Sequence, residues 1–313
     1  MDISDDGEEE PQNHSYIHHF DQLQRIGRGG FGTVYKVKHK LDAEIYAIKK
    51  VTYTEISDDH KHRVVDEVKC LAKLSSQYVV QYHNSWLDKN NNRLYIQMEY
   101  CPQSLRTVLE TKGPAFGRQW AAEAMNPFEY FISCEIFKEL LECVQYLHEL
   151  KPQIIHRDLK PENVLIANTL SGNNNNSRRF IKLCDFGLAT VHDPSRHTAS
   201  RYQHSAVGTR VYVAPEVYNG RYNHKSDIYS LGIIGQSLLD INIYDTQSFA
   251  ANDLLFKTSI ICMNELLEKM AANWKQRPEC REVLAKHNEW SIDKTVVANH
   301  KEFNSVLNTL KSN

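Results

Sequence analysis

The spacing of apolar residues changes near Tyr100, and this change constrains the fold more than any other feature of the sequence. Before it, runs of β-branched and aromatic residues alternate with turn residues, a pattern that is typical of strands. Strands are predicted at residues 33–37, 44–51, 78–86 and 93–100. One helix is expected among them, at about 58–74, because apolar residues recur there at i, i+4 and i+7.

After Tyr100 the apolar period lengthens to that of helices, along a face that includes Phe137, Leu140 and Leu147. Further helices are predicted at 226–239 and 264–272. Two segments without such a period, 111–125 and 168–179, are expected to be loops without a core. A strand-rich lobe followed by a helix-rich one predicts an α+β protein.

Composition bounds the class of protein. A chain of 313 residues that is 41% hydrophobic can bury a full core, and a net charge of −2 supplies no basic field for nucleic acid or an anionic membrane. The seven cysteines include no CxxC pair, which indicates a reducing compartment. With an acidic N-terminus and no long apolar run, we expect a cytoplasmic protein without a membrane segment.

The domain boundaries follow from the same patterns. Residues 1–19 are acidic and polar, so we expect a flexible leader. One folded domain is expected over 20–290, with a small lobe at about 20–100 and a larger one at about 101–290. A helical tail is expected at 291–313.

A glycine-rich segment, GxGxxGxV, runs from Gly27 to Val34 between two predicted strands. Without side chains, the backbone amides of such a loop can approach phosphate oxygens closely. A glycine-rich hairpin turn with no ligand is an equally open interpretation of this segment alone. Dinucleotide binding is disfavoured, because a strand rather than a helix follows.

Ala47 and Lys49 lie on one face of the strand that follows, since side chains alternate along a strand. A small residue against a flat ring and a lysine directed at phosphate form a plausible pair. Glu67, in the apolar stripe of the predicted helix, could hold Lys49 in place. Two surface charges without consequence are the alternative.

The segment His156–Asn163, HRDLKPEN, carries the strongest chemical signal in the chain. Phosphoryl transfer to a hydroxyl needs a carboxylate to orient the hydroxyl and accept its proton, and Asp158 supplies one. Lys160 supplies a cation for the transferring group, and Asn163 an amide oxygen for a metal. Downstream, Asp185 precedes Phe186 and Gly187 at the end of a hydrophobic strand, where its carboxylate can reach the same metal.

With Gly208-Thr209, Ala214-Pro215-Glu216 and Asp227, these motifs stand in the order of the protein-kinase fingerprint. The chain resembles the eukaryotic protein kinases from about residue 20 to 290. The resemblance implies a bilobal protein kinase fold that uses ATP and Mg²⁺. The sequence DLKPEN with its lysine, and Thr209 ahead of APE, are similar to the serine/threonine group.

The same resemblance assigns a role to each matching residue. Lys49 and Glu67 form an ion pair that serves catalysis, Asp158 and Lys160 act in the transfer, and Asn163 and Asp185 hold the metal. Glu216 pairs with Arg277. The residues assigned to ATP are Ile26, Gly27, Arg28, Gly29, Gly30, Phe31, Gly32, Thr33, Val34, Ala47, Lys49, Met98, Glu99, Cys101 and Leu165.

Within that group, the segments LYIQMEYC and NSW and the run ending in HRDLKPENVLIA are similar to the stress-regulated kinases of the translation initiation factor 2 alpha subunit. This similarity implies that the chain phosphorylates that subunit and represses protein synthesis, and that it forms a homodimer through the small lobe. The chain departs from that subfamily in its short turn at 89–92, in a short stretch between Asp227 and Arg277, and in the absence of room for a sensor domain in 19 leading residues.

Regulation by phosphorylation is expected, because Arg157 is the arginine that binds an activation-segment phosphate in this family. Thr198 and Ser205 are the candidate acceptors, and Thr209 is a further one. Two alternatives stay open, a serine/threonine kinase with another protein substrate and a nucleotide-binding pseudokinase scaffold.

Overall fold

The structure is a computed structural model that describes residues 18–29, 32–52, 68–88, 91–120, 123–167, 179–186, 190–191, 210–219, 223–244 and 254–298. The chain divides into two compact units, residues 1–73 with 81–100 and residues 74–80 with 101–313. Each unit is described by itself.

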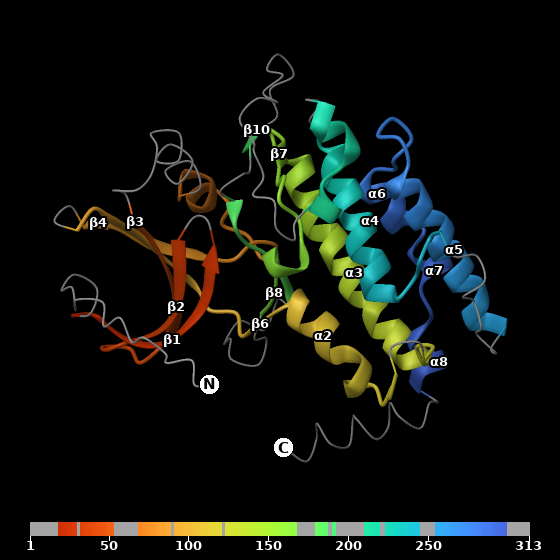
Figure 1. The fold of residues 1–313 in the computed structure, drawn as a ribbon, viewed down its shortest axis with the longest axis horizontal. Coiled ribbons are helices and arrows are strands. Elements are labelled where there is room, and N and C mark those ends of the chain that lie inside the picture. Colours follow the sequence, from red (N-terminus) through yellow and green to blue (C-terminus); the bar gives the residue numbers. More distant parts are fainter. Residues whose placement is uncertain are drawn as a thin grey trace, which may run out of the picture. The chain divides into compact units, whose positions relative to one another are not determined.

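The first unit is built on an antiparallel sheet of five strands (Figure 1). The strand order is β1-β2-β3-β5-β4, so neighbours in sequence pair except for β3 and β4, which are separated by β5. The strands are β1 (Phe20–Gly29), β2 (Gly32–His39), β3 (Ile45–Thr52), β4 (Tyr82–Asp88) and β5 (Arg93–Glu99). Asn92, directly before β5, has φ 48°, a left-handed conformation that asparagine tolerates.

One face of this sheet carries a compact aromatic cluster. Phe20, Val37, Ile48 and Tyr95 are buried together, one each from β1, β2, β3 and β5. Trp86 of β4 stacks on Tyr95 with ring centroids 5.5 Å apart. Because the cluster takes one side chain from every strand, its burial fixes which residues face the opposite side of the sheet.

The predicted strand at 78–86 is wrong in its first half. β4 begins at Tyr82, and residues 78–80 belong to the second unit. Val80 N–H donates to Leu183 O at 2.9 Å, and Leu183 N–H donates to Tyr78 O at 3.0 Å. Two distant partners therefore divide one continuous apolar run, which its local pattern could not indicate. Of the predicted helix at 58–74, residues 68–73 are helical and the residues before 68 lie outside the described part.

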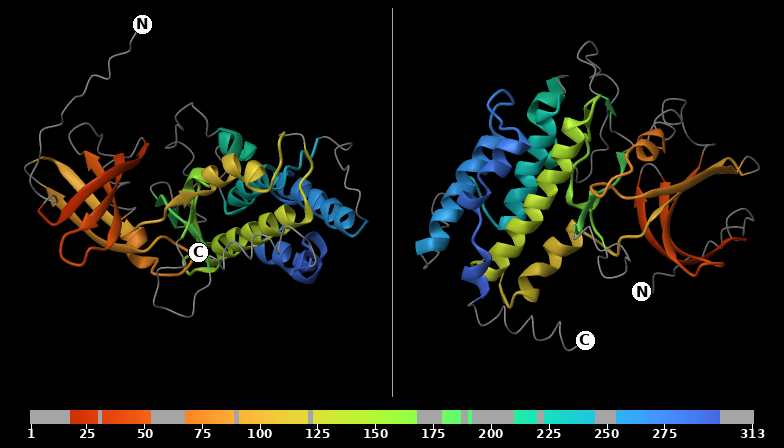
Figure 2. Two further views of the ribbon diagram at one scale, coloured as in Figure 1. Left: turned by 90° about the horizontal axis from the view of Figure 1, so that it is seen from below. Right: turned by 180° about the vertical axis from the view of Figure 1, so that it is seen from behind.

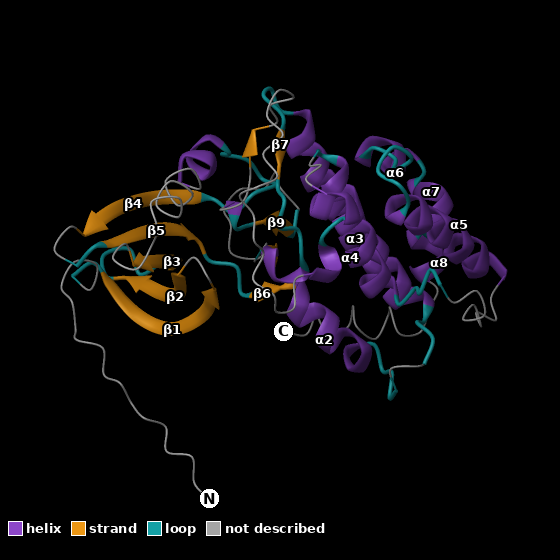
Figure 3. Ribbon diagram, turned by 45° about the horizontal axis from the view of Figure 1, so that its top comes forward, coloured by secondary structure: helices purple, strands orange, loops and turns teal. Residues whose placement is uncertain are grey.

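The second unit is mainly helical, as Figure 3 shows. The long helices α3 and α4 lie side by side, and α5 packs on α4 (Figures 1 and 2). Its helices are α2 (Leu105–Ala115), α3 (Pro127–Glu149), α4 (Lys225–Leu239), α5 (Leu254–Ala271), α6 (Cys280–Ala285), α7 (His287–Trp290) and α8 (Lys294–Ala298). Short 3₁₀ helices lie at η1 (Pro161–Asn163), η4 (Arg210–Tyr212) and η5 (Pro215–Asn219).

Small strands complete this unit. β8 (Val164–Ile166) pairs with β6 (Gln103–Ser104) and β9 (Ile181–Leu183), and β7 (Ile154–Ile155) pairs with β10 (Thr190–Val191). A glycine allows the close approach of the helices. A Cβ on Gly235 of α4 would lie 2.7 Å from Leu267 of α5 and 2.9 Å from the Phe137 ring of α3. Glycine at this position therefore lets both helices pack onto α4.

The segment 111–125 is not a loop without a core, contrary to the prediction. Its first residues form the last turn of α2, and Lys112 is buried there. Lys112 and Arg118 both pair with Glu129 of α3 and with Asp240 after α4. A buried charge must be paired to be tolerated, and this pairing spans more than a hundred residues of sequence. The turn residues in this segment favoured a loop, so the local sequence pattern did not indicate the buried ion pairs.

Other predicted segments lie largely outside the described residues. Of the leader predicted at 1–19, residues 1–17 are outside the described part, as are residues 168–178 of the loop predicted at 168–179. Of the tail predicted at 291–313, residues 291–298 are described and contain α8. None of the described helices combines the length and hydropathy needed to cross a membrane.

Candidate active site

The polar side chains of the HRDLKPEN segment converge on one carboxylate. Asp158 is buried, and its Oδ2 accepts from Lys160 Nζ at 2.8 Å and from Asn163 Nδ2 at 2.9 Å. The same Asn163 amide group donates to the Asp158 carbonyl at 2.8 Å. The tight turn of η1 brings Asn163 back toward Asp158, so three residues spaced over six positions meet at one point.

A second carboxylate, Asp227 in the first turn of α4, anchors this loop by accepting hydrogen bonds from its backbone. It accepts the backbone N–H of His156 at 2.9 Å and that of Arg157 at 3.0 Å. His148 Nε2 at the end of α3 donates to it at 2.9 Å. Burial raises the pKa of Asp227, but its hydrogen bonds and the nearby histidines outweigh burial and hold that pKa below its ordinary value. The loop is therefore anchored to an ionised, buried group.

Sequence reasoning placed Asp227 only as a member of the motif order and missed His148. An aspartate at the start of an apolar helical run is a signal for a helix cap rather than for a distant loop anchor. The partners lie 71 positions away at His156 and 79 positions away at His148. No local pattern indicates contacts of that separation.

A backbone hydrogen bond connects the segments that carry the two predicted metal ligands, Asn163 and Asp185. Cys184 N–H donates to Asn163 O at 3.0 Å, and Asp185 follows directly. His156, which is fully buried, links to the same place, since its Nε2 donates to Cys184 O at 3.1 Å. Phe186 packs against the His156 ring, with centroids 5.0 Å apart.

The donor set at Asn163 and Asp185 fits a divalent cation. Among the described residues, the Asn163 side chain makes its hydrogen bonds through Nδ2, which leaves its amide oxygen for a cation. A carboxylate and an amide oxygen are hard ligands of the type that divalent cations such as Mg²⁺ prefer.

The first unit presents the residues expected near the nucleotide. β1 and β2 form a hairpin in which Gly27 pairs with Val34, Arg28 with Thr33, and Gly29 with Gly32. Gly32 has φ 131°, and a Cβ there would lie 2.2 Å from Lys50 O of β3. Glycine is thus required at this position. Gly30 and Phe31, at the tip, lie outside the described residues, and Ile26 at the base is 41% exposed.

Strand register gathers four of the predicted residues on one face of the sheet. Val34 pairs with Lys49 across β2 and β3, and Ala47 pairs with Met98 across β3 and β5. Directly paired residues and residues two apart share a face, so Val34, Ala47, Lys49 and Met98 lie together. Ile48, between Ala47 and Lys49, points into the aromatic cluster on the opposite face.

The remaining predicted nucleotide residues lie at the end of β5, just beyond it, and within β8. Glu99 ends β5, where it pairs with Tyr46 of β3, and its N–H donates to Gln81 O at 2.8 Å. In the second unit, Cys101 is buried and Leu165 lies in β8, paired with Ser104 and Lys182.

The regulatory candidates are only partly described. Arg157 has φ 69°, a strained conformation for a residue with a side chain. Thr198, Ser205 and Thr209 lie outside the described residues, as does Glu67, the predicted partner of Lys49.

The pairing of Glu216 with Arg277 is confirmed. Arg277 donates to both carboxylate oxygens of Glu216, at 2.5 and 2.9 Å, and both side chains are buried. This two-pronged geometry is the strong form of an ion pair. It joins η5 to the segment before α6.

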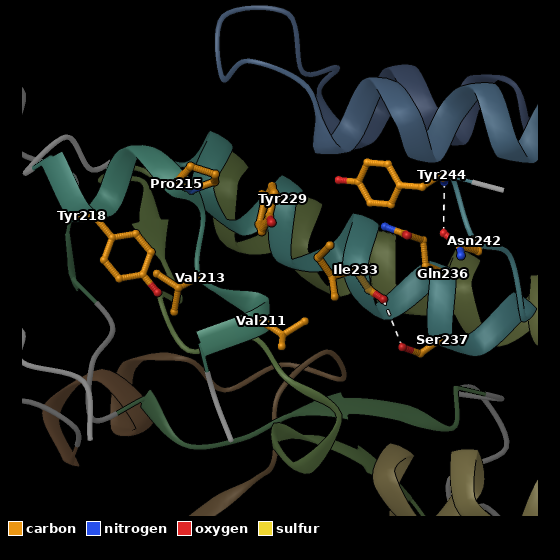
Figure 4. A pocket seen from close by; sticks show the side chains of 10 residues that line it. All are labelled: Val211, Val213, Pro215, Tyr218, Tyr229, Ile233, Gln236, Ser237, Asn242 and Tyr244. Carbon is orange, nitrogen blue, oxygen red and sulfur yellow. Dashed lines mark hydrogen bonds between the residues drawn. The ribbon is translucent and has the colours of Figure 1, made fainter. Parts of the chain in front are cut away.

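An open apolar cavity of about 630 Å³ lies along α4, and sequence reasoning did not predict it (Figure 4). The η4–η5 segment forms one wall, α4 the second, and the residues after α4 the third. Its lining residues are Val211, Val213, Pro215, Tyr218, Tyr229, Ile233, Gln236, Ser237, Asn242 and Tyr244.

Comparison with known proteins agrees with this geometry. The family model of the protein kinase domain matches residues 20–301. The chain belongs to the protein kinase family. Its five-stranded unit and its helical unit fit the bilobal α+β fold of such kinases, which use ATP and a divalent cation.

Curated relatives of this kinase domain are serine/threonine kinases. It is 30% identical over 294 residues to the interferon-induced, double-stranded RNA-activated protein kinase of Mus musculus. The aligned region covers 87% of this chain and 51% of the mouse protein. It is 34% identical over 220 residues to the probable serine/threonine-protein kinase nek2 of Dictyostelium discoideum. That alignment covers 69% of this chain and 47% of the relative.

A third relative is the eIF-2-alpha kinase GCN2 of Arabidopsis thaliana. That protein is 28% identical over 270 residues, which cover 70% of this chain and 20% of the relative. The chain spans about half the length of the first relatives it matches.

Proposed function

We propose that this domain is an active protein kinase that transfers the γ-phosphoryl group of ATP, with Mg²⁺, to serine or threonine hydroxyls of another protein. The observation that carries the proposal is the meeting of Lys160 and Asn163 at the Asp158 carboxylate. Phosphoryl transfer is catalysed mainly by positioning and charge, and these three groups are the ones that such a site needs.

In the proposed reaction, Asp158 orients the acceptor hydroxyl and takes its proton as the oxygen attacks phosphorus. Lys160, 2.8 Å from that carboxylate, lies close enough to stabilise charge on the transferring group. Asn163 and Asp185 would hold Mg²⁺, which neutralises phosphate charge when bound. Lys49 would bind the phosphates, and Val34, Ala47, Met98 and Leu165 would contact the adenine.

The test is transfer of labelled phosphate from ATP to a protein acceptor. Asp158→Asn should lower the rate by at least about a hundredfold, since general-base catalysis alone contributes on that order. Asp42→Asn, at an exposed turn after β2, is the matched control and should keep the rate. Equal rates for wild type and Asp158→Asn would refute the proposal and favour a pseudokinase scaffold.

We infer further that the substrate is the alpha subunit of translation initiation factor 2, whose phosphorylation would repress protein synthesis. Support comes from the relative whose name states that activity and from the resemblance of the segments before and within the catalytic loop. Purified alpha subunit should be phosphorylated faster than myelin basic protein or casein. A rate no higher than on those generic acceptors would overturn this substrate.

A second candidate is a serine/threonine kinase with a different protein substrate. The 34% identity to the Dictyostelium discoideum kinase nek2, higher than that to the GCN2 relative, favours it. The same assay separates the two candidates, because the second predicts transfer to generic acceptors without preference for the alpha subunit.

We place the protein in the cytoplasm. All seven cysteines lie among the described residues and none of them forms a disulfide, which supports a reducing compartment. A homodimer through the strand-rich unit is part of the same proposal, and sedimentation analysis of the purified chain would test it.

A further inference from the structure

An exposed ion pair lies directly beside the catalytic loop. Arg106, in the first turn of α2, donates through Nε to Glu162 Oε1 at 2.9 Å. Glu162 lies within η1, between Lys160 and Asn163 in sequence. The side chains of Arg106 and Glu162 are 38% and 46% exposed, so both groups can be reached by a protein that binds here.

The guanidinium group has a second neighbour that limits its position. Arg106 Nη2 lies 3.4 Å from the hydroxyl of Tyr212 in η4. Tyr212 is itself buried, and its carbonyl accepts from Ser230 Oγ of α4 at 2.7 Å. Arg106 therefore lies between a carboxylate of the catalytic loop and a fixed phenol, and is held toward Glu162 from two sides.

Glu162 lies close to the carboxylate that would receive the acceptor hydroxyl. It directly precedes Asn163, whose side-chain amide donates to the Asp158 carboxylate at 2.9 Å, so Glu162 is the sequence neighbour of a residue that contacts the proposed catalytic base. An acceptor that places its hydroxyl at Asp158 brings its neighbouring residues to Glu162. An exposed carboxylate without a partner at that point would attract a lysine or arginine of the acceptor.

On the other side of Tyr212 lies the uncharged cavity along α4. The cavity along α4 begins at Val211 and Val213, which flank Tyr212 in sequence (Figure 4). Tyr218 and Tyr244, 63% and 88% exposed, offer further apolar ring surface there. No lining residue of this cavity carries a charge.

We propose that Arg106 shapes the substrate specificity of this kinase by occupying Glu162, so that a basic residue next to the acceptor hydroxyl gives an acceptor no advantage. Arg106 forms the ion pair with Glu162 that a lysine or arginine of the substrate would otherwise form. The inference rests on the proposed kinase function and concerns the class of acceptor.

Competition favours the internal partner. A single exposed ion pair is weak, but Arg106 is tethered next to Glu162, and a tethered group acts at an effective concentration of the order of millimolar or more. A lysine or arginine of an acceptor must displace Arg106 from Glu162. Its own ion pair with Glu162 therefore adds little to the affinity of the acceptor. Removal of the guanidinium group should therefore reveal a preference that the wild-type protein does not have.

The experiment measures transfer to a set of serine peptides with small apolar flanks. Each carries one arginine, or the neutral isostere citrulline, at successive positions on either side of the serine. The readout is the ratio of kcat/KM for arginine over citrulline, which is normalised within each variant. The same fluorescently labelled peptides are also measured by anisotropy, a binding readout that needs no transfer.

Wild type should give ratios near one at all positions. Arg106→Met, which keeps the length of the side chain, should raise the ratio at one or two positions by roughly fivefold, the equivalent of about 1 kcal/mol. Arg106→Lys should stay near one, because the cation is retained. Arg106→Met combined with Glu162→Gln should return to one, since the revealed carboxylate is gone.

An unchanged ratio in Arg106→Met, or a gain that persists in the double variant, would overturn the inference. Failure of the kinase proposal has a different signature, since no peptide would be phosphorylated by wild type. In that event the anisotropy ratios of the same four proteins decide whether Arg106 covers Glu162.

Discussion

At the scale of single residues, two of the strained backbone conformations lie in the proposed catalytic motifs. Arg157, directly before Asp158, has a φ of 69°, and Asp185, the first residue of the DFG motif, has a φ of 62°. Each such conformation costs of the order of 1 kcal/mol or more and persists only where the surroundings enforce it. The hydrogen bond from Arg157 N–H to Asp227 is one such restraint.

Gly32 is the glycine of the loop whose replacement should be most damaging. Gly32→Ala should lower the free energy of unfolding by about 2 kcal/mol or more, because it adds a contact of 2.2 Å with Lys50 O to an unfavourable φ. Gly27→Ala is the matched control, since its Cβ would meet only Val34 at 3.8 Å. Urea unfolding compares them, and equal losses would contradict this account.

The buried pair of Glu216 and Arg277 should behave as a unit. Arg277→Met leaves an unpaired buried carboxylate and should cost about 3–5 kcal/mol of unfolding free energy. Arg277→Met combined with Glu216→Gln removes that charge and should recover part of the loss. Denaturant unfolding of the four proteins forms a double-mutant cycle, and strictly additive effects would argue against direct coupling.

At the scale of elements, the N-terminus of α4 joins most of the second unit. Asp227 in its first turn holds the catalytic loop, while His224 and Lys225 both contact Glu279 at the start of α6, at 3.1 and 2.5 Å. Lys225 Nζ also donates to Arg277 O at 2.7 Å. One helix end thus connects the catalytic loop with the helices that follow α5.

His224 should make stability depend on pH. Burial lowers the pKa of its imidazole below 6.5, more than Glu279 raises it, so the folded state favours neutral His224. The unfolded chain then binds more protons between the lowered pKa and 6.5, and the stability that is present above pH 6.5 is lost as pH falls through this window.

The comparison of wild type with His224→Asn isolates this contribution. Thermal unfolding should show the wild type losing more stability than the variant between about pH 7 and pH 5, the range in which an ordinary histidine titrates. Parallel pH profiles for the two proteins would show that His224 does not contribute.

At the scale of the whole molecule, the proposed chemistry draws on both units. Lys49 lies on the sheet of the first unit and Asp158 on the catalytic loop of the second. If both serve one transfer step, Lys49→Met and Asp158→Asn should each lower kcat/KM by roughly a hundredfold or more. The double variant should lose much less than the product of the two effects, because groups that act as a unit are not additive. Single-turnover assays measure this, and full additivity would argue for separate roles.

Sequence motifs were sufficient for the chemistry, because phosphoryl transfer needs particular residue types at short spacings. Asp158, Lys160 and Asn163 fall within six residues, and one turn of 3₁₀ helix brings them together. The strands of the first unit were also predictable in large part, since their pattern of alternation is local.

Long-range pairing decided everything that no local pattern could show. The division of 78–86 between two units, the burial of Lys112 with Glu129, the anchoring of the catalytic loop by Asp227 and the occupation of Glu162 by Arg106 each join residues that are far apart in sequence. A buried charge or an unpaired backbone group takes the nearest partner that the fold supplies, and the fold alone determines which partner is near. The sequence by itself therefore determined which reaction this protein can perform, and the tertiary structure decided what holds its catalytic groups in place.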